Sequence, residues 1–331
     1  MATPLTAAVV PDRGAPWWLP GGHAQTVWAA LFARPGSGPA PRWRRERWST
    51  PDGDFIDVDF ADAAPGAPLL VLFHGLEGSS ASHYARAFAR WAHAQGWGCV
   101  VPHFRGCSGE LNLAPRAYHS GDFEEIGWIL ARLRAAHGRP LLAAGISLGG
   151  NALLRWAEEA GDSAAGVARA VAAISSPLDL AAGGAALSRG FSLHVYTRMF
   201  LRTMVPKALA KLAQHPGLFS RERLLAARTL HDFDDVFTAP LHGFRNADDY
   251  WARASAKPQL ARIRIPALAL NARNDPFVPA ASLPRPHEAG PSVTLWQPAD
   301  GGHVGFAAGP FPGRLTPLPQ AVGGWLREAM A

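Results

Sequence analysis

The sequence predicts an α/β fold in which helices cover both faces of a mostly parallel central sheet. From Phe55 onward, short apolar or β-branched runs alternate with longer amphipathic segments, a pattern typical of such folds. Near the middle, an apolar run passes through a glycine-rich turn at 145–150 directly into a helix-like segment. The 331 residues are 48% hydrophobic, which is enough for one sizeable core. We therefore expect residues 1–331 to form a single domain.

Before residue 178, apolar runs predict buried strands, and the segments between them carry apolar residues at helical spacing. The predicted strands are 69–73, 99–102, 140–144 and 168–174, and the predicted helices cover 84–92, 123–133 and 148–156.

This alternation stops between residues 178 and 235, where aromatic and apolar residues crowd into helix-like sequence. We expect an inserted helical cap over 178–235. Asn246 has the side chain of a helix start. Strand sequence resumes at 267–270 and 292–296, and a final amphipathic helix is expected over 318–330.

The formal net charge of +6 includes a dense cluster at residues 42–48, where arginines and tryptophans are interleaved. Such a cluster can indicate a nucleic-acid binding face. Its alternation at period two is more typical of an edge strand whose charges discourage pairing with another sheet. We expect an edge strand here and no nucleic-acid partner.

The segment from Gly145 to Gly149 has the G-x-S-x-G pattern of a nucleophile elbow. A serine hydroxyl becomes an effective nucleophile when a sharp strand-to-helix turn presents it to a base and to backbone N–H groups. The two glycines stand where side chains would collide across such a turn. The alternative is a glycine-rich turn with an incidental serine, but the strand before it and the helix after it favour Ser147 as a nucleophile.

A serine nucleophile needs a histidine base, and the base needs an acid that holds its tautomer. On doubly wound sheets these follow the serine in the order acid, then histidine. Asp275 comes directly after a predicted strand, and His303 lies in a glycine-rich loop after the last strand. Asp300 is the rival acid, but it stands three residues from the base on the same loop. We predict Ser147, His303 and Asp275 as the catalytic residues.

The oxyanion of an acyl-transfer intermediate needs two backbone N–H donors. We expect one from Leu148, which follows the nucleophile, and one from Leu76, in the loop after strand 69–73. His74, in the same loop, is interpreted as shaping it. Cys107 is an alternative nucleophile, but the sequence places no base or helix start beside it.

Six blocks of sequence, some of them already described, occur together in one order. They are Pro16–Thr26, His74–Gly78, Phe104–Gly109, Gly145–Asn151, Thr238–Phe244 and Asn274–Phe277. With these blocks the sequence resembles the YheT-like branch of the α/β-hydrolases over nearly its whole length. The resemblance implies an α/β-hydrolase fold and an ester-hydrolysing enzyme with Ser147, Asp275 and His303 as its triad. The many alanines and glycines at 181–186 depart from relatives, so pocket size is not carried over.

These observations predict a serine hydrolase that cleaves carboxylic esters, with short- to medium-chain acyl groups, through an acyl-enzyme. The resemblance extends in more distant relatives to acylglycerols and phospholipids. An apolar cap agrees with an acyl ligand, although its aromatic residues are equally expected to form the core of the cap itself. Two alternatives stay open: an acyltransferase that uses the same acyl-enzyme, and a non-catalytic lipid-binding protein on a hydrolase fold.

The two cysteines, Cys99 and Cys107, form no C-x-x-C pair and have no histidine at metal-ligand spacing. We expect no metal, no cofactor and a reducing compartment. Residues 1–5 lack the basic start of a signal peptide, and no apolar run is long enough to cross a bilayer. The sequence therefore predicts a cytoplasmic protein.

A weak contact with a membrane surface is a further expectation for the cap. Arg198, Arg202, Lys207 and Lys211 lie near apolar cap residues, as in an interfacial helix. The alternative is an ordinary solvated face. The sequence makes no prediction of the oligomeric state.

Overall fold

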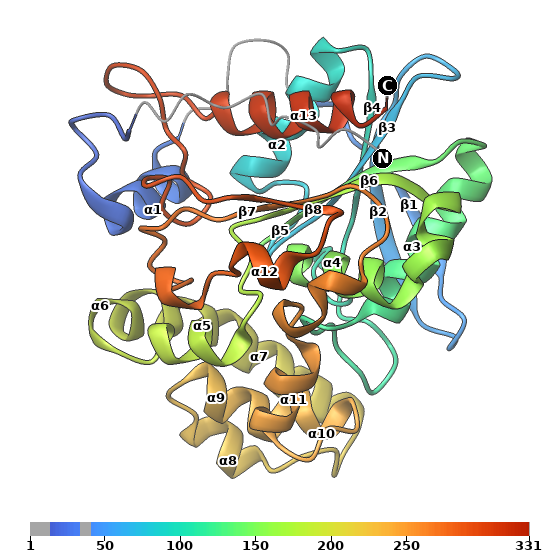
Figure 1. Cartoon of the computed structure of the whole chain (residues 1–331). Coiled ribbons are helices and arrows are strands. Elements are labelled where there is room, and N and C mark those ends of the chain that lie inside the picture. Colours follow the sequence, from blue (N-terminus) through green and yellow to red (C-terminus); the bar gives the residue numbers. More distant parts are fainter. Residues whose placement is uncertain (1–13, 34–40, 331) are drawn as a thin grey trace.

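The computed structural model describes residues 14–33 and 41–330, and its centre is an eight-stranded sheet (Figure 1). Residues 1–5, which carried the argument about a targeting segment, lie outside the described residues. The strands follow the order β1-β2-β4-β3-β5-β6-β7-β8. They are β1 (Arg44–Ser49), β2 (Phe55–Ala61), β3 (Leu69–Phe73), β4 (Gly98–Pro102), β5 (Leu141–Ile146), β6 (Ala168–Ile174), β7 (Ala267–Leu270) and β8 (Val293–Trp296).

Strands β3 to β8 run parallel to one another, whereas β2 is antiparallel to β4 and β1 is antiparallel to β2. The prediction of an α/β fold with a mostly parallel sheet is therefore confirmed. The arginine-rich segment is β1, at one edge of the sheet, as predicted. Arg45 and Arg47 form ion pairs with Asp59 and Asp57 of β2, at 2.7 and 2.8 Å.

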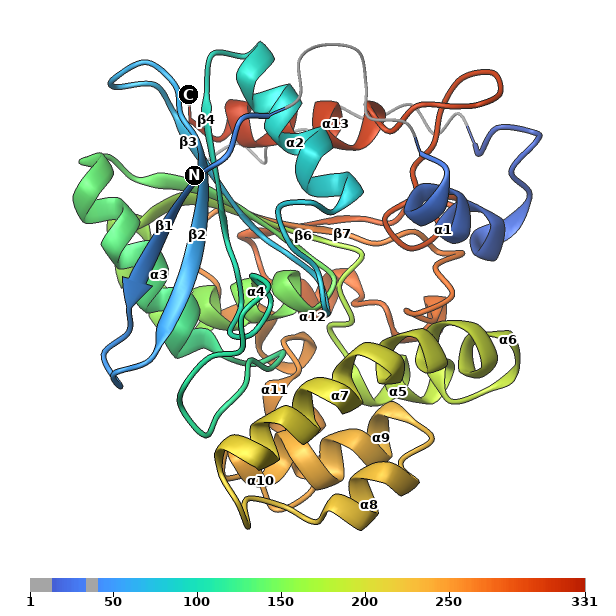
Figure 2. The same cartoon turned by 180° about the vertical axis from the view of Figure 1, so that it is seen from behind.

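Helices cover both faces of the sheet because the central strands are apolar on both sides. On β3, Leu70 and Leu72 pack into the cluster that contains Phe88, whereas Val71 and Phe73 pack into the cluster on the opposite face. Figures 1 and 2 show α2 and α13 on one side of the sheet and α3 and α4 on the other. These helices are α2 (His83–Ala94), α3 (Phe123–His137), α4 (Leu148–Ala160) and α13 (Pro317–Glu328).

Helices also fill most of the stretch between β6 and β7, beyond the carboxyl ends of the strands (Figure 1). They continue past residue 235, the end of the expected cap, to residue 254. Ala208, Phe233 and Phe237 belong to an apolar cluster of this region's own. The segments are α5 (Leu180–Leu187), α6 (Gly190–Ser192), π-helix η2 (Leu193–Thr197), α7 (Arg198–Gln214), α8 (Arg221–Ala226), α9 (Leu230–Phe233), π-helix η3 (Asp234–Thr238), α10 (Ala239–Leu241) and α11 (Ala247–Ala254).

The remaining helical elements are short, apart from α1, which packs beside the carboxyl ends of the last strands (Figure 1). They are α1 (Gly21–Leu31), α12 (Pro286–Ala289) and the 3₁₀ turns η1 (Gly161–Gly166), η4 (Lys257–Arg262) and η5 (Ala280–Ser282). None of the helices within residues 14–33 and 41–330 is long and apolar enough to cross a membrane.

Helix α13 packs against α2 through a glycine, which gives a test of this contact. A Cβ at Gly323 would lie 2.3 Å from the Trp91 ring, so Gly323→Ala forces overpacking. We expect a loss of about 1–3 kcal/mol in the free energy of unfolding, measured in urea. Gly324→Ala is the matched control, because nothing lies within 4 Å of its Cβ position. It should be neutral or stabilising by up to about 1 kcal/mol, and equal effects at both positions would contradict the packing.

Candidate active site

Ser147 stands at the turn between β5 and α4 with φ 51° and ψ −119°, a strained conformation for a residue with a side chain. The turn fits only because its neighbours are glycines. A Cβ at Gly145 would lie 2.4 Å from the Gly149 carbonyl oxygen, and a Cβ at Gly149 would lie 2.4 Å from that of His74. The predicted elbow is thus present, and it lifts the serine above the end of the sheet.

The structure brings the three predicted side chains together. Asp275 follows β7 and His303 follows β8, and both loops lie at the same end of the sheet as Ser147. His303 Nδ1 is 2.9 Å from Asp275 Oδ2, and His303 Nε2 is 3.1 Å from Ser147 Oγ. Because a carboxylate only accepts, Nδ1–H is the donor to Asp275, which leaves Nε2 free to accept the serine proton.

Further contacts fix the acid and the imidazole ring. The Phe277 N–H donates to Asp275 Oδ1 at 2.8 Å. The Phe277 ring stacks on the His303 imidazole with centroids 4.0 Å apart. The Asp275 carboxylate has no solvent exposure, and the His303 side chain is 11% exposed. The pair is therefore largely held out of water.

Asp300, the rival acid, serves other groups. Its carboxylate accepts hydrogen bonds from Asn274 Nδ2 at 2.8 Å, Gln25 Nε2 at 3.4 Å and the Ala15 N–H at 3.3 Å. These contacts tie neighbouring loops together.

The two expected oxyanion donors belong to the two segments that adjoin Ser147. Leu148 is the first residue of α4, where a helix N–H has no partner within the helix. Leu76 lies in the loop after β3, which passes so close that a Cβ at Gly75 would be 3.3 Å from Ser147 Cβ. Within the described part of the chain, neither N–H donates to a protein acceptor. Both residues line the same pocket as Ser147.

His74 is fully buried and holds the loop that carries Leu76. Its Nδ1–H donates to the Gly75 carbonyl oxygen at 2.8 Å, and its Nε2 accepts from the Phe104 N–H at 3.0 Å. Burial lowers the pKa of His74 to about 3, so the ring is neutral at physiological pH. These contacts agree with the interpretation of His74 as a loop-shaping residue.

Cys107 does not have the environment of a reactive thiol. Burial raises the pKa of its thiol to about 12, so the thiolate is scarce at neutral pH. Among residues 14–33 and 41–330, no group of three or more histidine, cysteine or acidic side chains is placed to hold a metal ion.

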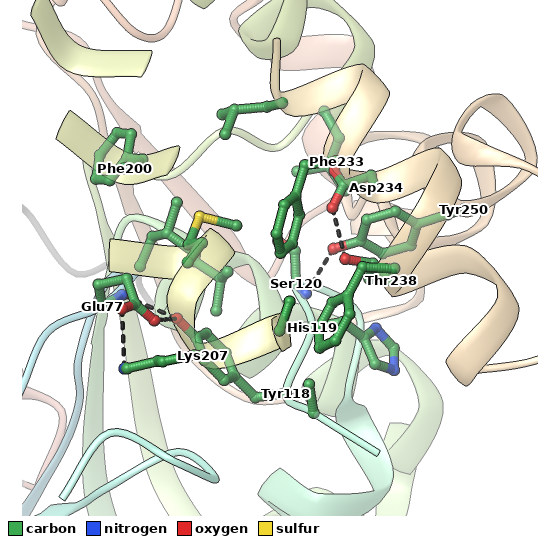
Figure 3. Close-up of a pocket in the computed structure, with 18 of the residues that line it drawn as sticks. Glu77, Tyr118, His119, Ser120, Phe200, Lys207, Phe233, Asp234, Thr238 and Tyr250 are labelled. Carbon is green, nitrogen blue, oxygen red and sulfur yellow. Dashed lines mark hydrogen bonds and ion pairs between the residues drawn. The ribbon is translucent and has the colours of Figure 1, made fainter. Parts of the chain in front are cut away.

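A pocket of about 1150 Å³, measured with its open mouth, is lined by Ser147 and by residues of the cap. Figure 3 shows part of its wall, including Phe200 and Phe233 of the cap. Apolar side chains from the cap and from the loop that carries Asp275 form much of its wall. They are Leu180, Leu187, Phe200, Met204, Leu230, Phe233, Phe237 and Phe277.

Charged and polar groups occupy two other parts of the pocket wall. Near Leu76, the Glu77 carboxylate accepts a hydrogen bond from the Tyr118 hydroxyl and forms a 2.8 Å ion pair with Lys207 of α7 (Figure 3). In another part of the wall, the Asp234 carboxylate accepts hydrogen bonds from Thr238 Oγ1 at 2.6 Å and from the Trp251 indole N–H. Neither Glu77 nor Asp234 was predicted to have a role in the site, because neither belongs to a motif whose chemistry is readable from spacing.

The lysines of α7 are not free surface charges. Lys207 is held by Glu77, and Lys211 is only 1% exposed. The Lys211 ammonium donates to the carbonyl oxygens of Asn112 and Ala114, at 2.5 and 2.9 Å. This placement removes Lys211 from the cap surface where the sequence analysis expected it.

Comparisons with known proteins identify the family of this chain. Residues 68–310 match the family model described as the alpha/beta hydrolase fold. A protein of Escherichia coli (strain K12), named "Putative esterase YheT", is 39% identical over 310 residues, which cover 92% of this chain and 88% of that protein. The chain belongs to the YheT-like branch of the α/β-hydrolases.

Other relatives of this hydrolase carry related names. Mouse "Phospholipase ABHD3" is 31% identical over 294 residues, covering 85% of this chain and 70% of that protein. Among solved structures, the Pyrococcus furiosus esterase Pf2001 superimposes with a TM-score of 0.55 at 16% identity, covering 91% of this chain and 99% of the other. The structural match shows the fold, and the sequence relatives support a hydrolase of the esterase and lipase type.

Asp234 gives this hydrolase a testable pH dependence of stability. Burial raises its pKa in the folded protein to about 6 from 3.8. The folded state therefore binds more protons than the unfolded state, and stability falls as pH rises from about 4 to 6. Asp234→Asn removes this loss. Relative to the wild type, it should gain up to about 2–3 kcal/mol in unfolding free energy between pH 4 and pH 7.

Urea unfolding at the two pH values measures this difference. Asp235→Asn, at the partly exposed neighbour that pairs with Arg223, is the control for loss of one negative charge in the same turn. If wild type and Asp234→Asn show the same pH dependence, the Asp234 carboxylate is not responsible.

Proposed function

We propose that this protein is a serine carboxylesterase that works through an acyl-enzyme, with Ser147 as nucleophile, His303 as base and Asp275 as the orienting acid. The observation that carries the proposal is the continuous hydrogen-bonded chain from Asp275 through His303 to Ser147 Oγ, at the end of an apolar pocket. Family membership and the names of the relatives support it.

The steps follow from this geometry. His303 Nε2 takes the proton of Ser147 as Oγ attacks the ester carbonyl carbon. The carbonyl oxygen becomes an oxyanion, and the N–H groups of Leu76 and Leu148 stabilise it. His303 then gives its proton to the departing alkoxide, so that an alcohol leaves and an acyl-serine remains. Water repeats the sequence with His303 as base and releases the carboxylic acid and the free enzyme.

The pocket fits the acyl part of a short- to medium-chain ester. Side chains of the cap and the acid loop, including Leu187, Phe200 and Phe277, make its wall apolar near Ser147. Apolar walls with a few polar groups are typical of sites for such ligands. Phe233 and Phe237 belong both to the core of the cap and to the ligand pocket, because they pack in the cap's own cluster and also line the pocket.

Ser147→Ala tests the proposal. The variant keeps the elbow but lacks the nucleophile, so hydrolysis of p-nitrophenyl esters should fall by about 10⁴-fold or more. An ester series from two to twelve acyl carbons, run on the wild type, should show its highest kcat/KM among the shorter chains. A fluorophosphonate probe should label the wild type and not the variant.

Ser163→Ala is the control for loss of a serine hydroxyl, because Ser163 is exposed and only donates to the Ala160 carbonyl oxygen. It should retain wild-type rates and labelling. Hydrolysis that survives in Ser147→Ala contradicts the assignment of the nucleophile. A folded wild type that neither turns over esters nor reacts with the probe supports a non-catalytic protein instead.

We also propose a weak contact between the cap and an anionic membrane surface, now limited to the outer face of α6, η2 and α7. Phe191, Val195 and Met199 are exposed there, 51%, 38% and 51%, at helical spacing. Arg198 and Arg202 are exposed beside them, and neither forms an ion pair among the described residues. Apolar side chains flanked by cations suit the interface of an anionic bilayer.

Co-sedimentation with vesicles that contain anionic lipid tests this contact. Each arginine near such a surface contributes about 1 kcal/mol, so the Arg198→Ala/Arg202→Ala variant should bind roughly 10- to 30-fold more weakly. Arg42→Ala/Arg139→Ala is the control, because both arginines are exposed next to the amino ends of the parallel strands, away from the cap. Absence of wild-type binding, or an equal loss in both variants, would reject the contact.

A further inference from the structure

The loop that carries His303 is held by side chains rather than by a strand or helix. Four successive backbone N–H groups, from Gly301 to Val304, each donate to a side-chain oxygen. The acceptors are Gln25 Oε1 at 2.8 Å, Asn274 Oδ1 at 2.9 Å, Thr26 Oγ1 at 2.8 Å and Ser175 Oγ at 3.1 Å, in that order.

Two of these four acceptors, Gln25 and Thr26, are adjacent residues of α1. Thr26 accepts from the N–H of His303 itself, and its hydroxyl donates to the Gly22 carbonyl oxygen at 2.7 Å, which fixes the orientation of Oγ1. Gln25 is 1% exposed, and its Oε1 also accepts from Asn274 Nδ2 at 3.1 Å. Helix α1 thus contacts the loop of the base and the loop of the acid at the same time.

Backbone contacts show how closely α1 fits against both loops. A Cβ at Gly22 would lie 1.8 Å from the Asn274 carbonyl oxygen, one residue before Asp275. Gly302 has φ +56°, and a Cβ there would lie 2.8 Å from Gln25 Cβ. The loop is also strained beyond the histidine, since Val304 has φ 59°. Such a conformation persists only where surrounding groups hold it.

We propose that Thr26 and Gln25 are positioning residues, which act through the backbone of the loop to set the direction of the His303 imidazole toward Ser147. This inference rests on the proposed function. Neither residue lines the pocket. Asp275 and Phe277 hold the ring of His303, but they do not fix where its Cα lies. Catalytic geometry tolerates displacements of only about 0.5 Å. The hydrogen bond from the His303 N–H to Thr26 fixes the backbone of the base, so its loss should lower the catalytic rate.

Thr26→Val tests the inference because it keeps the shape of the side chain and removes its hydroxyl. We expect kcat for a p-nitrophenyl ester to fall by about 10- to 100-fold, while KM changes by less than about twofold, since no contact with substrate is altered. Thr26→Ser restores the acceptor and should return kcat to within about threefold of wild type. A merely structural role would lower the melting temperature without this split between kcat and KM.

Thr50→Val is the matched control, because Thr50 is buried to the same degree as Thr26, 5% against 6% exposed, and its hydroxyl bonds only Asp52. It should retain wild-type kcat. Gln25→Met is the second variant, and rates are normalised to folded protein. The inference is overturned if Thr26→Val keeps wild-type kcat, or if it unfolds and Gln25→Met keeps wild-type kcat.

The same measurements separate this inference from the proposed function. If the wild type hydrolyses esters and Ser147→Ala does not, the proposed function stands whatever Thr26→Val shows. If the wild type is folded but inactive and does not react with the fluorophosphonate probe, the proposed function fails and the inference fails with it.

Discussion

The tight backbone contact around Ser147 is the constraint on which the rest of the site depends. Strand β5 and helix α4 meet so closely that no Cβ fits at Gly145 or Gly149, and Gly149 lies directly against the carbonyl oxygen of His74. This contact accompanies the positive φ of Ser147 and starts α4 at Leu148, beside the loop after β3 that carries Leu76, the other proposed oxyanion donor. A larger residue at either glycine would displace all of these groups together.

The sheet provides the second level of organisation, because it places distant parts of the chain at one edge. Ser147, Asp275 and His303 follow β5, β7 and β8, which run parallel in the order β5-β6-β7-β8. Ligands bind at the carboxyl ends of strands in open α/β sheets. The strands are rigid and buried, whereas the histidine lies on a loop, and the side chains of α1 supply the rigidity that this loop lacks.

Much of the fold could be predicted from the sequence because burial leaves a strong local pattern. The runs at 168–174 and 267–270 are β6 and β7 with the predicted ends, since both strands are almost wholly buried and apolar. The alternating segment at the start is the edge strand. The elbow could be predicted for a related reason, because a turn with no room for side chains requires glycine at the positions of closest contact.

What could not be predicted depends on contacts between distant residues. Gln25 and Thr26 lie more than 270 positions from the loop they hold, and nothing in their own segment indicates that contact. The spacing of Lys207 and Lys211 suggested a charged surface, but α7 contains Pro206 and is apolar on several sides, so spacing does not tell which face is covered. After residue 230 the helices are short and include the π-helix η3, so they lack the periodic pattern that would have predicted how far the helical region extends.

The ion pair between Glu77 and Lys207 has a mechanical consequence. It joins the segment next to Leu76 to helix α7, and so adds a surface ion pair to the buried hydrogen bonds by which Lys211 holds the same helix. Lys207 is 39% exposed, and a pair so open to water contributes at most about 1 kcal/mol and weakens with added salt. The hold of α7 on the body of the protein therefore has one part that salt can weaken and one part, the buried Lys211 hydrogen bonds to Asn112 and Ala114, that lies out of reach of salt.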